Sequence, residues 1–379
     1  MKIKVVQISS DTNIGGAGKC ILTFLDNYDR GKFDMGVVLP FNSKLKEPIL
    51  SRGVAVTEVD GISDKSLSIK GIFALIRVFK TIKPDIIHTH ASMSARIAGR
   101  LWGKCRIIYT RHCVYPPGRL MTKGIFKFIN GAVNNLTADR IIAVAEAAKE
   151  NLTAAGADGD RIEVVLNGIS PVKKLSDDEK GQVRREYNIP SKNKVVSILA
   201  RLEPVKGHNY FIDEAYQVAA VRDDVTFIIA GIGSAAEELK AKVAALGLEE
   251  RVIFTGFVED VSHIVNITDI SVNASYGTEA TSIALLEGMC LGKPAVVSDY
   301  GGNPGVIENG VNGFLFPVAD AGKLAERILE ILSDDELYAR LSDGALKIFD
   351  ERFNASVYTR GIERIYMEVF ARNASKTTL

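Results

Sequence analysis

The stretch NASYGTEATSIALLEGMCLGKPAVVSD (residues 273–299) decides the fold that we expect for this chain. An apolar run precedes it, and a Lys-Pro pair leads into a second apolar run near its end. This order predicts a strand, a loop, a helix, a turn and a second strand. Thr281 or Ser282 is expected to cap the helix, because a hydroxyl oxygen accepts a hydrogen bond from a backbone N–H that the first turn leaves without a partner.

Two glutamates in this stretch, Glu279 and Glu287, stand before and within the expected helix. At ~1.5 Å per residue, about 12 Å separates them along the helix axis. That distance suits a nucleotide-sugar with one hydroxyl-bearing ring at each carboxylate, and the amides at the helix start suit its phosphates. The alternative is a solvated loop glutamate and a surface helix glutamate. Taken alone, the two residues favour that alternative.

Charged residues and glycines follow other expected strands of the same half. Arg201 stands at the end of the apolar run 195–200, and Lys206 follows after a short loop. Gly231 follows the run 226–230, and Gly301 follows the run 295–298. Ligands of open α/β sheets bind beyond the carboxyl ends of the strands, so these residues are expected at one edge. Two cations there can hold a diphosphate, and a glycine lets the backbone approach a ligand closely.

With these motifs the chain resembles the retaining glycosyltransferases of family 4, which have the GT-B fold. The resemblance covers nearly the whole length and departs from the family pattern at Gly305, usually Glu, and at Gly288, commonly Ala. It implies an α/β fold of two Rossmann-like domains whose parallel sheets face an interdomain cleft. It rests on the two glutamates, Arg201 with Lys206, Asn167-Gly168-Ile169, GGNPGVIENGVNGFLFP (301–317), GGAG (15–18), DIIHTH (85–90) and YTRH (109–112).

The resemblance also implies roles for single residues. Glu279 would hold hydroxyls of the donor sugar, and Glu287 would hold the ribose. His112 would line the donor-sugar pocket. Arg201, Lys206 and the amides of Ser282 and Ile283 would stabilise the charge of the diphosphate. Gly231 and the glycine-rich turn with Gly15 and Gly16 would face it.

That N-terminal turn follows the first expected strand and opens a helix, which suits an anion. It lacks the G-x-G-x-x-G spacing of a dinucleotide site, and Lys19 is not followed by Ser or Thr as in a P-loop. We therefore expect no cofactor and only the nucleotide-sugar, most simply a UDP-sugar, as donor. We also expect no metal: His88, His90 and His112 make zinc conceivable, but supporting Cys or carboxylate spacing is missing.

Length and composition predict two domains. At 379 residues, each domain has room for its own core. We expect an acceptor-binding domain over 1–172, a nucleotide-sugar-binding domain over 173–354, and a last helix within 355–379 that crosses back to the first domain. The chain has neither a ~20-residue apolar run nor a signal-peptide pattern, and its four cysteines have no C-x-x-C spacing. These features favour a cytoplasmic protein, peripheral on the inner face of a membrane if bound there.

Charge is distributed unevenly along the chain. The formal net charge is +1, yet residues 86–138 contain no acidic residue and eight basic ones. The chain has no nucleic-acid-binding motif, so an anionic membrane surface fits this run better than nucleic acid. Within it, Arg119, Lys123 and Lys127 alternate with apolar residues. A core-packed helix with a solvated basic face explains this pattern equally well.

The favoured function is metal-independent transfer of a hexose, with retention, from a nucleotide diphosphate to an acceptor hydroxyl. The acceptor would be a precursor of a lipid-linked or cell-surface polysaccharide. A soluble small-molecule or protein acceptor remains an alternative, as does a catalytically silent nucleotide-sugar-binding subunit. An epimerase of the same fold would lack the two glutamates, and a sugar phosphorylase would have extra length and a cofactor lysine.

Overall fold

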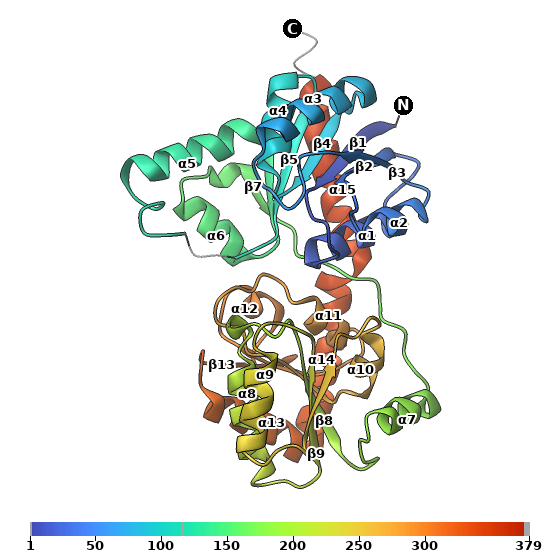
Figure 1. The fold of residues 1–379 in the computed structure, drawn as a ribbon, viewed down its shortest axis with the longest axis vertical. Helices are drawn as coiled ribbons and strands as arrows, with labels where there is room; N and C mark the ends of the chain where they lie inside the picture. The colour runs from blue at the N-terminus through green and yellow to red at the C-terminus, as the bar shows by residue number, and fades with distance from the viewer. Residues whose placement is uncertain (1, 115–116, 375–379) are drawn as a thin grey trace. The chain divides into compact units, whose positions relative to one another are not determined.

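The computed structural model describes residues 2–114 and 117–374, with side chains described as far as residue 371. The chain divides into two compact units, shown in Figure 1. The first unit contains Met1–Ile169 together with Ala355–Leu379, and the second contains Ser170–Asn354. The units therefore divide at Ile169, three residues before the boundary expected from the sequence.

The first unit is built on a parallel sheet of seven strands in the order β3-β2-β1-β4-β5-β6-β7. Its strands are β1 (Ile3–Ser9), β2 (Phe33–Pro40), β3 (Ala55–Val59), β4 (Ile86–His90), β5 (Arg106–Arg111), β6 (Arg140–Ala143) and β7 (Ile162–Val164). Its helices are α1 (Gly16–Asn27), α2 (Lys46–Leu50), α3 (Ile69–Ile82), α4 (Met93–Trp102), α5 (Gly124–Thr137), α6 (Glu146–Ala154) and α15 (Ala355–Ala374). The strand order reverses direction between β1 and β4.

The last helix completes the core of the first unit, although it follows the whole second unit in the sequence. Tyr366 of α15 is fully buried against the rings of Phe24 and Phe33, with centroids 5.7 and 5.6 Å away. Its hydroxyl lies 3.2 Å from Gln7 Nε2 and 2.7 Å from His88 Nδ1. A buried tyrosine hydroxyl needs such partners, and here β1 and β4 provide them.

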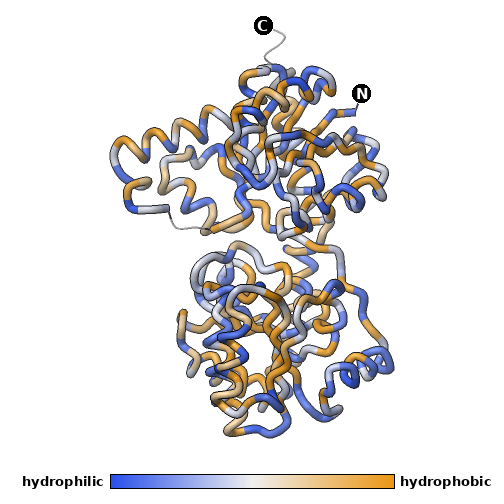
Figure 2. The backbone as a smooth tube through the Cα atoms, viewed as in Figure 1, coloured by the Kyte–Doolittle hydropathy of each residue, from blue (hydrophilic) through white to orange (hydrophobic). Residues whose placement is uncertain are grey.

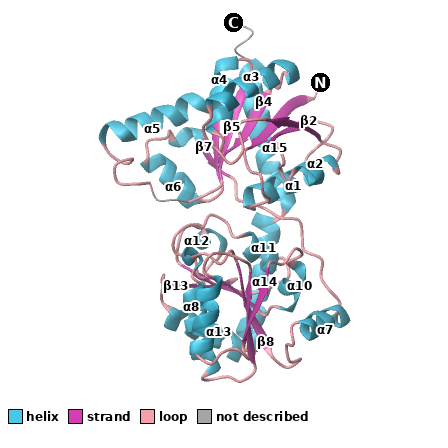
Figure 3. Ribbon diagram, in the orientation of Figure 1, coloured by secondary structure: helices cyan, strands magenta, loops and turns pink. Residues whose placement is uncertain are grey.

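The second unit is built on a parallel sheet of six strands in the order β10-β9-β8-β11-β12-β13. Its strands are β8 (Lys194–Leu199), β9 (Val225–Ala230), β10 (Val252–Gly256), β11 (Ile270–Asn273), β12 (Ala295–Ser298) and β13 (Gly313–Phe316). Its helices are α7 (Asp177–Glu186), α8 (His208–Ala219), α9 (Ala236–Ala245), α10 (Ser262–Ile267), α11 (Ile283–Met289), α12 (Asn303–Val306), α13 (Ala321–Ser333) and α14 (Asp335–Ile348). Figure 3 shows the helices around the strands in both units.

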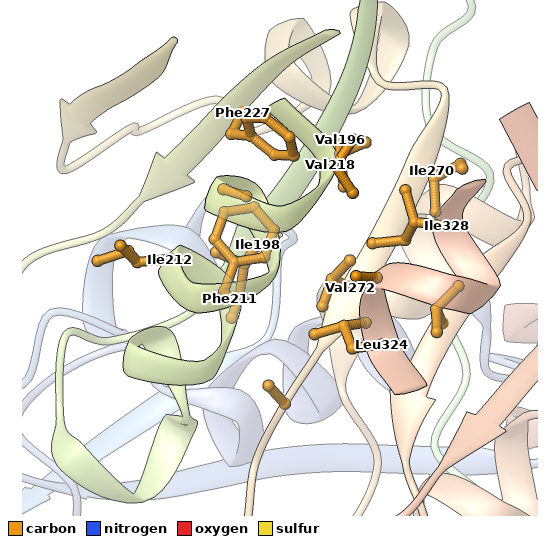
Figure 4. Packing of buried hydrophobic residues seen from close by; sticks show 14 of the residues in the cluster. Val196, Ile198, Phe211, Ile212, Val218, Phe227, Ile270, Val272, Leu324 and Ile328 are labelled. Atoms are coloured by element: carbon orange, nitrogen blue, oxygen red, sulfur yellow. The ribbon is translucent and has the colours of Figure 1, made fainter. Parts of the chain in front are cut away.

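The core of the second unit joins α8 and α13 to the sheet, as Figure 4 shows. Phe211 of α8 meets Phe227 of β9 edge to face, with ring centroids 6.0 Å apart. Ile328 and Leu324 of α13 belong to the same cluster and are fully buried. This packing fixes the direction of β8 and β11, whose carboxyl ends carry the residues described next.

Candidate active site

The strand order of the second unit reverses between β8 and β11, which are neighbours in the sheet. In parallel α/β sheets, loops diverge at such a point and leave room for a ligand at the carboxyl ends. Arg201 and Lys206 lie in the loop after β8, and Glu279 lies in the loop after β11. The sequence-predicted cations and the first glutamate therefore share one edge of one sheet.

Lys206 and Glu279 form an ion pair at this edge. Lys206 Nζ lies 3.0 Å from Glu279 Oε2 and donates a second bond, of 3.1 Å, to the carbonyl oxygen of Thr278. The same Oε2 accepts hydrogen bonds of 3.0 Å from Asn273 Nδ2 and from Ser275 Oγ. Both charged side chains are largely buried, so three donors on one oxygen hold the carboxylate in a single orientation.

The two loops that carry this pair are joined through their backbones. Tyr276 N donates a 2.9 Å hydrogen bond to the carbonyl oxygen of Val205. Gly207 has φ of +76°, and a Cβ there would overlap the carbonyl oxygen of Ala274. Only glycine allows this combination of left-handed backbone and close approach. The spacing of Lys206 from Glu279 is thus set by main chain as well as by side chains.

A third loop, after β12, supports the glutamate loop. Gly302 N donates a 3.0 Å hydrogen bond to the carbonyl oxygen of Glu279, and a Cβ at Gly302 would overlap Ala280. Ser298 Oγ donates to the carbonyl oxygen of Ser275, at 2.6 Å. Gly305, where the resembled family usually has Glu, faces open space, so packing does not require a glycine there.

Arg201 and Gly231 lie in neighbouring loops. Arg201 is exposed, and among the described residues nothing pairs with its guanidinium. Gly231 has φ of +147°, and a Cβ there would overlap the carbonyl oxygen of Ala200. Glycine is therefore required at this position by the approach of the backbone to Ala200, just after β8. Its contact with a ligand remains a prediction, as do the roles of the other site residues.

Helix α11 begins where the sequence predicts. Ser282 is its N-cap, and Ser282 Oγ accepts a 3.4 Å hydrogen bond from Leu285 N. Ile283 is the first helical residue, and Glu287 lies in the second turn and is 8% exposed. Gly288 lies against β11, because a Cβ there would meet Ser271 Oγ at 2.6 Å. The two glutamates are thus both largely buried and not the solvated surface residues of the alternative interpretation.

The glycine-rich turn of the first unit leads into α1. Gly15 is the N-cap of this helix and Gly16 its first residue, and both are exposed. A Cβ at either position would meet nothing within 4 Å. Packing therefore does not demand glycine there, and the contact of this turn with a phosphate remains a prediction.

Three histidines of the first unit lie close together, two in β4 and one just after β5. The rings of His88 and His90 have centroids 4.5 Å apart, and those of His90 and His112 are 5.0 Å apart. His90 Nδ1 lies 2.7 Å from His112 Nε2, and His88 Nε2 lies 2.6 Å from Thr110 Oγ1. Burial lowers the pKa of His88 to about 3, that of His112 to about 4 and that of His90 well below its usual value, so all three rings are neutral at pH 7.

Within the described part of the chain, no three His, Cys, Asp or Glu side chains come together as a metal-binding group. What the second unit offers is positive charge next to an oriented carboxylate: Arg201 is exposed to solvent, and Lys206 is held beside Glu279. Such a set can bind an anionic group and a hydroxyl-bearing group side by side.

Sequence reasoning missed two residues of this set. Asn273 and Ser275 both donate to Glu279, and neither was a predicted site residue. A signal was present, because Asn273 is a polar residue at the carboxyl end of a strand that is buried throughout. A polar side chain in that position is buried, and it needs a partner there.

Two parallel sheets of this kind, each with its order reversing beside the first strand, define the GT-B class of glycosyltransferase fold. The Anabaena Alr3699/HepE structure in complex with UDP matches with a TM-score of 0.83 at 24% identity, over 97% of this chain and 100% of that one. A glycosyltransferase from Rickettsia africae ESF-5 matches with a TM-score of 0.82 at 20% identity, over 97% of this chain and 98% of that one. The predicted fold class is confirmed.

Family profiles match both units. The profile described as Glycosyl transferases group 1 matches residues 179–348, and Glycosyltransferase Family 4 matches residues 14–173. The chain is 24% identical to the Escherichia coli UDP-Gal:alpha-D-GlcNAc-diphosphoundecaprenol alpha-1,3-galactosyltransferase, over 97% of each chain. It is 28% identical to the alpha-D-kanosaminyltransferase of Streptomyces kanamyceticus, over 50% of this chain and 49% of that protein. The chain belongs to glycosyltransferase family 4, which confirms the predicted relationship.

Proposed function

We propose that the protein transfers a hexose from a UDP-sugar to a hydroxyl of a lipid-linked glycan precursor, with retention at the anomeric carbon and without a metal ion. The observation that carries this proposal is the Lys206–Glu279 pair, with the exposed Arg201 in the same loop as Lys206, at the point where the sheet order reverses. This set provides cations for a leaving diphosphate and an anchored carboxylate for the sugar.

The cationic groups would act on the leaving diphosphate, and the carboxylates would hold the sugars of the donor. The bond between the anomeric carbon and the phosphate oxygen breaks, and negative charge develops on UDP. Lys206 and Arg201 stabilise that charge electrostatically, with the amides of Ser282 and Ile283 as further donors. The acceptor oxygen bonds to the anomeric carbon on the face that UDP leaves, and its proton passes to a phosphate oxygen. Atoms and charge balance without a protein nucleophile.

The two glutamates hold the hydroxyl groups of the donor. Glu279 Oε2 already accepts three hydrogen bonds, so Oε1 is the oxygen that would accept from sugar hydroxyls. Glu287, in the second turn of α11, would accept from the ribose. His112 would contact the sugar from the first unit. Its ring is neutral and linked to His90, so it can serve as a hydrogen-bond donor or acceptor but not as a cation.

The related proteins support the choice of donor and acceptor. A solved structure of similar fold is in complex with UDP, and another of the same protein is in complex with UDP-glucose. The Escherichia coli relative uses UDP-Gal and a sugar linked to diphosphoundecaprenol, as its name states. These are properties of those proteins, and they make a UDP-hexose and a lipid diphosphate the first substrates to test.

The test is a donor and acceptor screen on the purified full chain. UDP-, GDP- and ADP-sugars are first ranked by thermal shift, because a ligand that binds the native state raises the melting temperature. UDP release is then measured with the best donor, alone and with a short-chain polyprenyl-diphosphate sugar. NMR of the product gives the anomeric configuration.

We expect slow donor hydrolysis alone, faster UDP release with the acceptor, and retained configuration. Binding without hydrolysis or transfer would favour the silent binding subunit. Transfer only to a water-soluble acceptor would favour the alternative acceptor class. An inverted product would overturn the retaining mechanism, and failure of every nucleotide-sugar to bind would overturn the proposal as a whole.

A further inference from the structure

Helix α5 presents its apolar side chains to solvent. Six large apolar residues of this helix are between 37% and 71% exposed. Leu120 and Met121, just before the helix, are 73% and 48% exposed. At 100° per residue the six form one face of the helix. We call this surface the α5 apolar face; it comprises Ile125, Phe126, Phe128, Ile129, Val133 and Leu136. Figure 2 shows the hydrophobic colouring along this segment, and Figure 1 locates α5.

The polar side of α5 faces the protein instead. Asn134 is buried, and its Oδ1 accepts a 3.0 Å hydrogen bond from the guanidinium of Arg96. Asn130 Nδ2 donates to the carbonyl oxygen of Ala155, at 2.7 Å. A Cβ at Gly131 would overlap the backbone of Gly156. The helix is therefore held through asparagines and a close backbone contact, which fixes its apolar face outward.

This arrangement contradicts one of the two interpretations of the sequence. A core-packed helix with a solvated basic face would bury its apolar residues, whereas here they are the exposed ones. The reason is that the helix has one apolar stripe and one stripe of asparagine and glycine, and the second stripe packs against α4 and the residues after α6. An apolar surface of this extent on a soluble domain marks a site of interaction with a protein or a membrane.

The charges around the α5 apolar face decide which partner fits. Arg119 and Lys123 are exposed just before the helix, and Lys127 is exposed within it on the side of Gly131; all three belong to a run of chain that has no acidic residue from 86 to 138. Glu146 and Glu150 of α6 share a shallow recess with Lys127 and Lys149, so they offset only part of this charge. A second copy of the chain would bring the same basic residues against it, and like charges would repel.

We propose that the α5 apolar face docks on an anionic lipid bilayer. The helix has 14 residues, so it is about 21 Å long, and it would lie in the plane of the headgroups with its apolar side chains below them. The basic residues would contact anionic headgroups. Among the described residues no helix is long and apolar enough to cross a membrane, so the attachment proposed is peripheral. This membrane attachment does not depend on which donor or acceptor the protein uses.

The first experiment is co-sedimentation of the full chain with vesicles of phosphatidylcholine, alone or with a third of phosphatidylglycerol. We expect the protein to sediment with the anionic vesicles at low salt and to be released as salt rises, because salt screens surface charges. Changing Arg119, Lys123 and Lys127 to Glu should weaken binding by at least about a hundredfold, because losing each basic residue near the surface costs about fivefold and each new carboxylate is repelled by the anionic lipid. Reversing the exposed Arg77, Lys80 and Lys65 of the same unit is the matched control.

A second pair of variants tests the apolar contribution. Ile125→Ser with Phe128→Ser removes two residues of the face, which are 62% and 71% exposed. Ile69→Ser with Phe73→Ser removes an isoleucine and a phenylalanine of similar exposure from α3, at 74% and 60%. We expect at least tenfold weaker vesicle binding for the α5 pair and no change for the α3 pair. Circular dichroism and melting temperature show that each variant is folded.

Fluorescence reports insertion directly. The chain has one tryptophan, Trp102, so Phe128→Trp adds a second emitter on the α5 apolar face. Its emission should shift to shorter wavelength with anionic vesicles, whereas that of Phe73→Trp should not. Absence of wild-type binding at low salt, equal binding to neutral vesicles, or full binding by the α5 variants overturns the proposal. A dimer in sedimentation equilibrium that the Ile125→Ser, Phe128→Ser variant abolishes would instead assign the face to a second copy.

Discussion

Lys206 Nζ and Glu279 Oε2 are 3.0 Å apart, although the two residues are 73 positions apart in the sequence. Each comes from a loop at the carboxyl end of a different strand, and each neutralises the charge of the other in a largely buried position. A ligand that binds Lys206 must therefore compete with Glu279 for the ammonium group, and a ligand that binds Glu279 must compete with Lys206 for the carboxylate. Mutation of either residue also changes the environment of its partner, which the following predictions take into account.

Arg201→Ala and Lys206→Ala should both reduce transfer, by roughly 10²- to 10³-fold, because each removes a group that stabilises the leaving diphosphate. Their effects on folding should differ. Arg201 is exposed and unpaired among the described residues, so its removal should change the free energy of unfolding by less than about 0.5 kcal/mol. Lys206→Ala leaves Glu279 without its cation and should cost about 1–3 kcal/mol. Kinetics and urea denaturation measure the two effects, and wild-type turnover in either variant would remove the leaving-group argument.

Glu287→Gln should weaken UDP binding by about ten- to a hundredfold, because a hydrogen bond to a charged group contributes ~1.5–3 kcal/mol. Glu279→Gln should leave UDP binding nearly intact and reduce turnover and discrimination between hexoses. Calorimetry with UDP and steady-state kinetics with UDP-hexoses separate the two. Ser275→Ala is a milder control, since it removes one of the three donors to Glu279 and keeps the charge. The opposite pattern would show that the two roles are exchanged.

Transfer should persist after treatment with EDTA, because Lys206 and Arg201 provide the positive charge that a metal ion would otherwise supply at the diphosphate. A metal-dependent transferase assayed in the same buffer shows that chelation is complete. Loss of activity on chelation, restored by Mn²⁺ or Mg²⁺, would instead establish a metal-dependent reaction.

The first unit should lose stability as pH falls from about 6.5 towards 4. Burial lowers the pKa of His88 to about 3 and that of His90 well below its usual value, whereas in the unfolded chain both are near 6.5. Between these values the unfolded state binds protons that the folded state does not, so unfolding becomes easier as pH falls. For His88 the slope is about 1.4 kcal/mol per pH unit.

The emission of Trp102, in α4, reports unfolding of the unit that holds these histidines. Urea midpoints at pH 7.5, 6.5 and 5.5 measure the slope. His88→Asn should reduce it, and substitution of the exposed His263 should not. A midpoint that stays constant over this range would contradict the prediction.

Glu214 of α8 should make the second unit less stable at alkaline pH. It is fully buried, neither carboxyl oxygen has a partner among the described residues, and burial raises its pKa well above the usual value. As pH rises above about 4.5, the unfolded state releases a proton that the folded state retains, so stability falls. Glu214→Met should raise the free energy of unfolding by about 1–3 kcal/mol at pH 8 and by less at pH 5.

Calorimetric melting at the two pH values tests this, with Glu238→Met on the exposed side of α9 as control. Equal effects of Glu214→Met at both pH values would mean that the carboxyl group does not hold its proton in the folded state.

Much of the fold could be predicted because local sequence is enough to specify it. The sequence pattern predicts a strand over 55–59 and a helix over 69–82, and the structure has both with these bounds, as Ala55–Val59 and Ile69–Ile82. In α3 the hydroxyl of Ser68 caps the first turn. Strand ends are predicted less well: the pattern predicts a strand over 86–88, whereas β4 continues to His90. Whether a polar residue such as His90 still pairs in the sheet depends on β1 and β5, which the local sequence does not reveal.

The edge that carries the site could also be predicted, because parallel strands end together. The hydrogen bonds within it could not. Nothing near Lys206 in the sequence indicates that it pairs with Glu279, and nothing near Asn273 indicates that its amide completes that pair. The orientation of α5 was equally hidden, since an apolar stripe does not say which side of a helix faces the protein. Gly131 and Asn134 mark the side of α5 that faces the protein, but this is evident only when their contacts with Gly156 and Arg96 are known.

The position of Tyr366 has a consequence for the order in which the protein is made. The second unit is continuous in sequence, so all of its residues have been synthesised once Asn354 has been added. The first unit begins the chain, yet its core lacks the ring between Phe24 and Phe33 until α15 is synthesised. The first unit is therefore the first to be translated and the last to complete its core. A chain that stops before Ala355 would contain a complete second unit and a first unit with an open apolar cavity, exposed to chaperones and proteases.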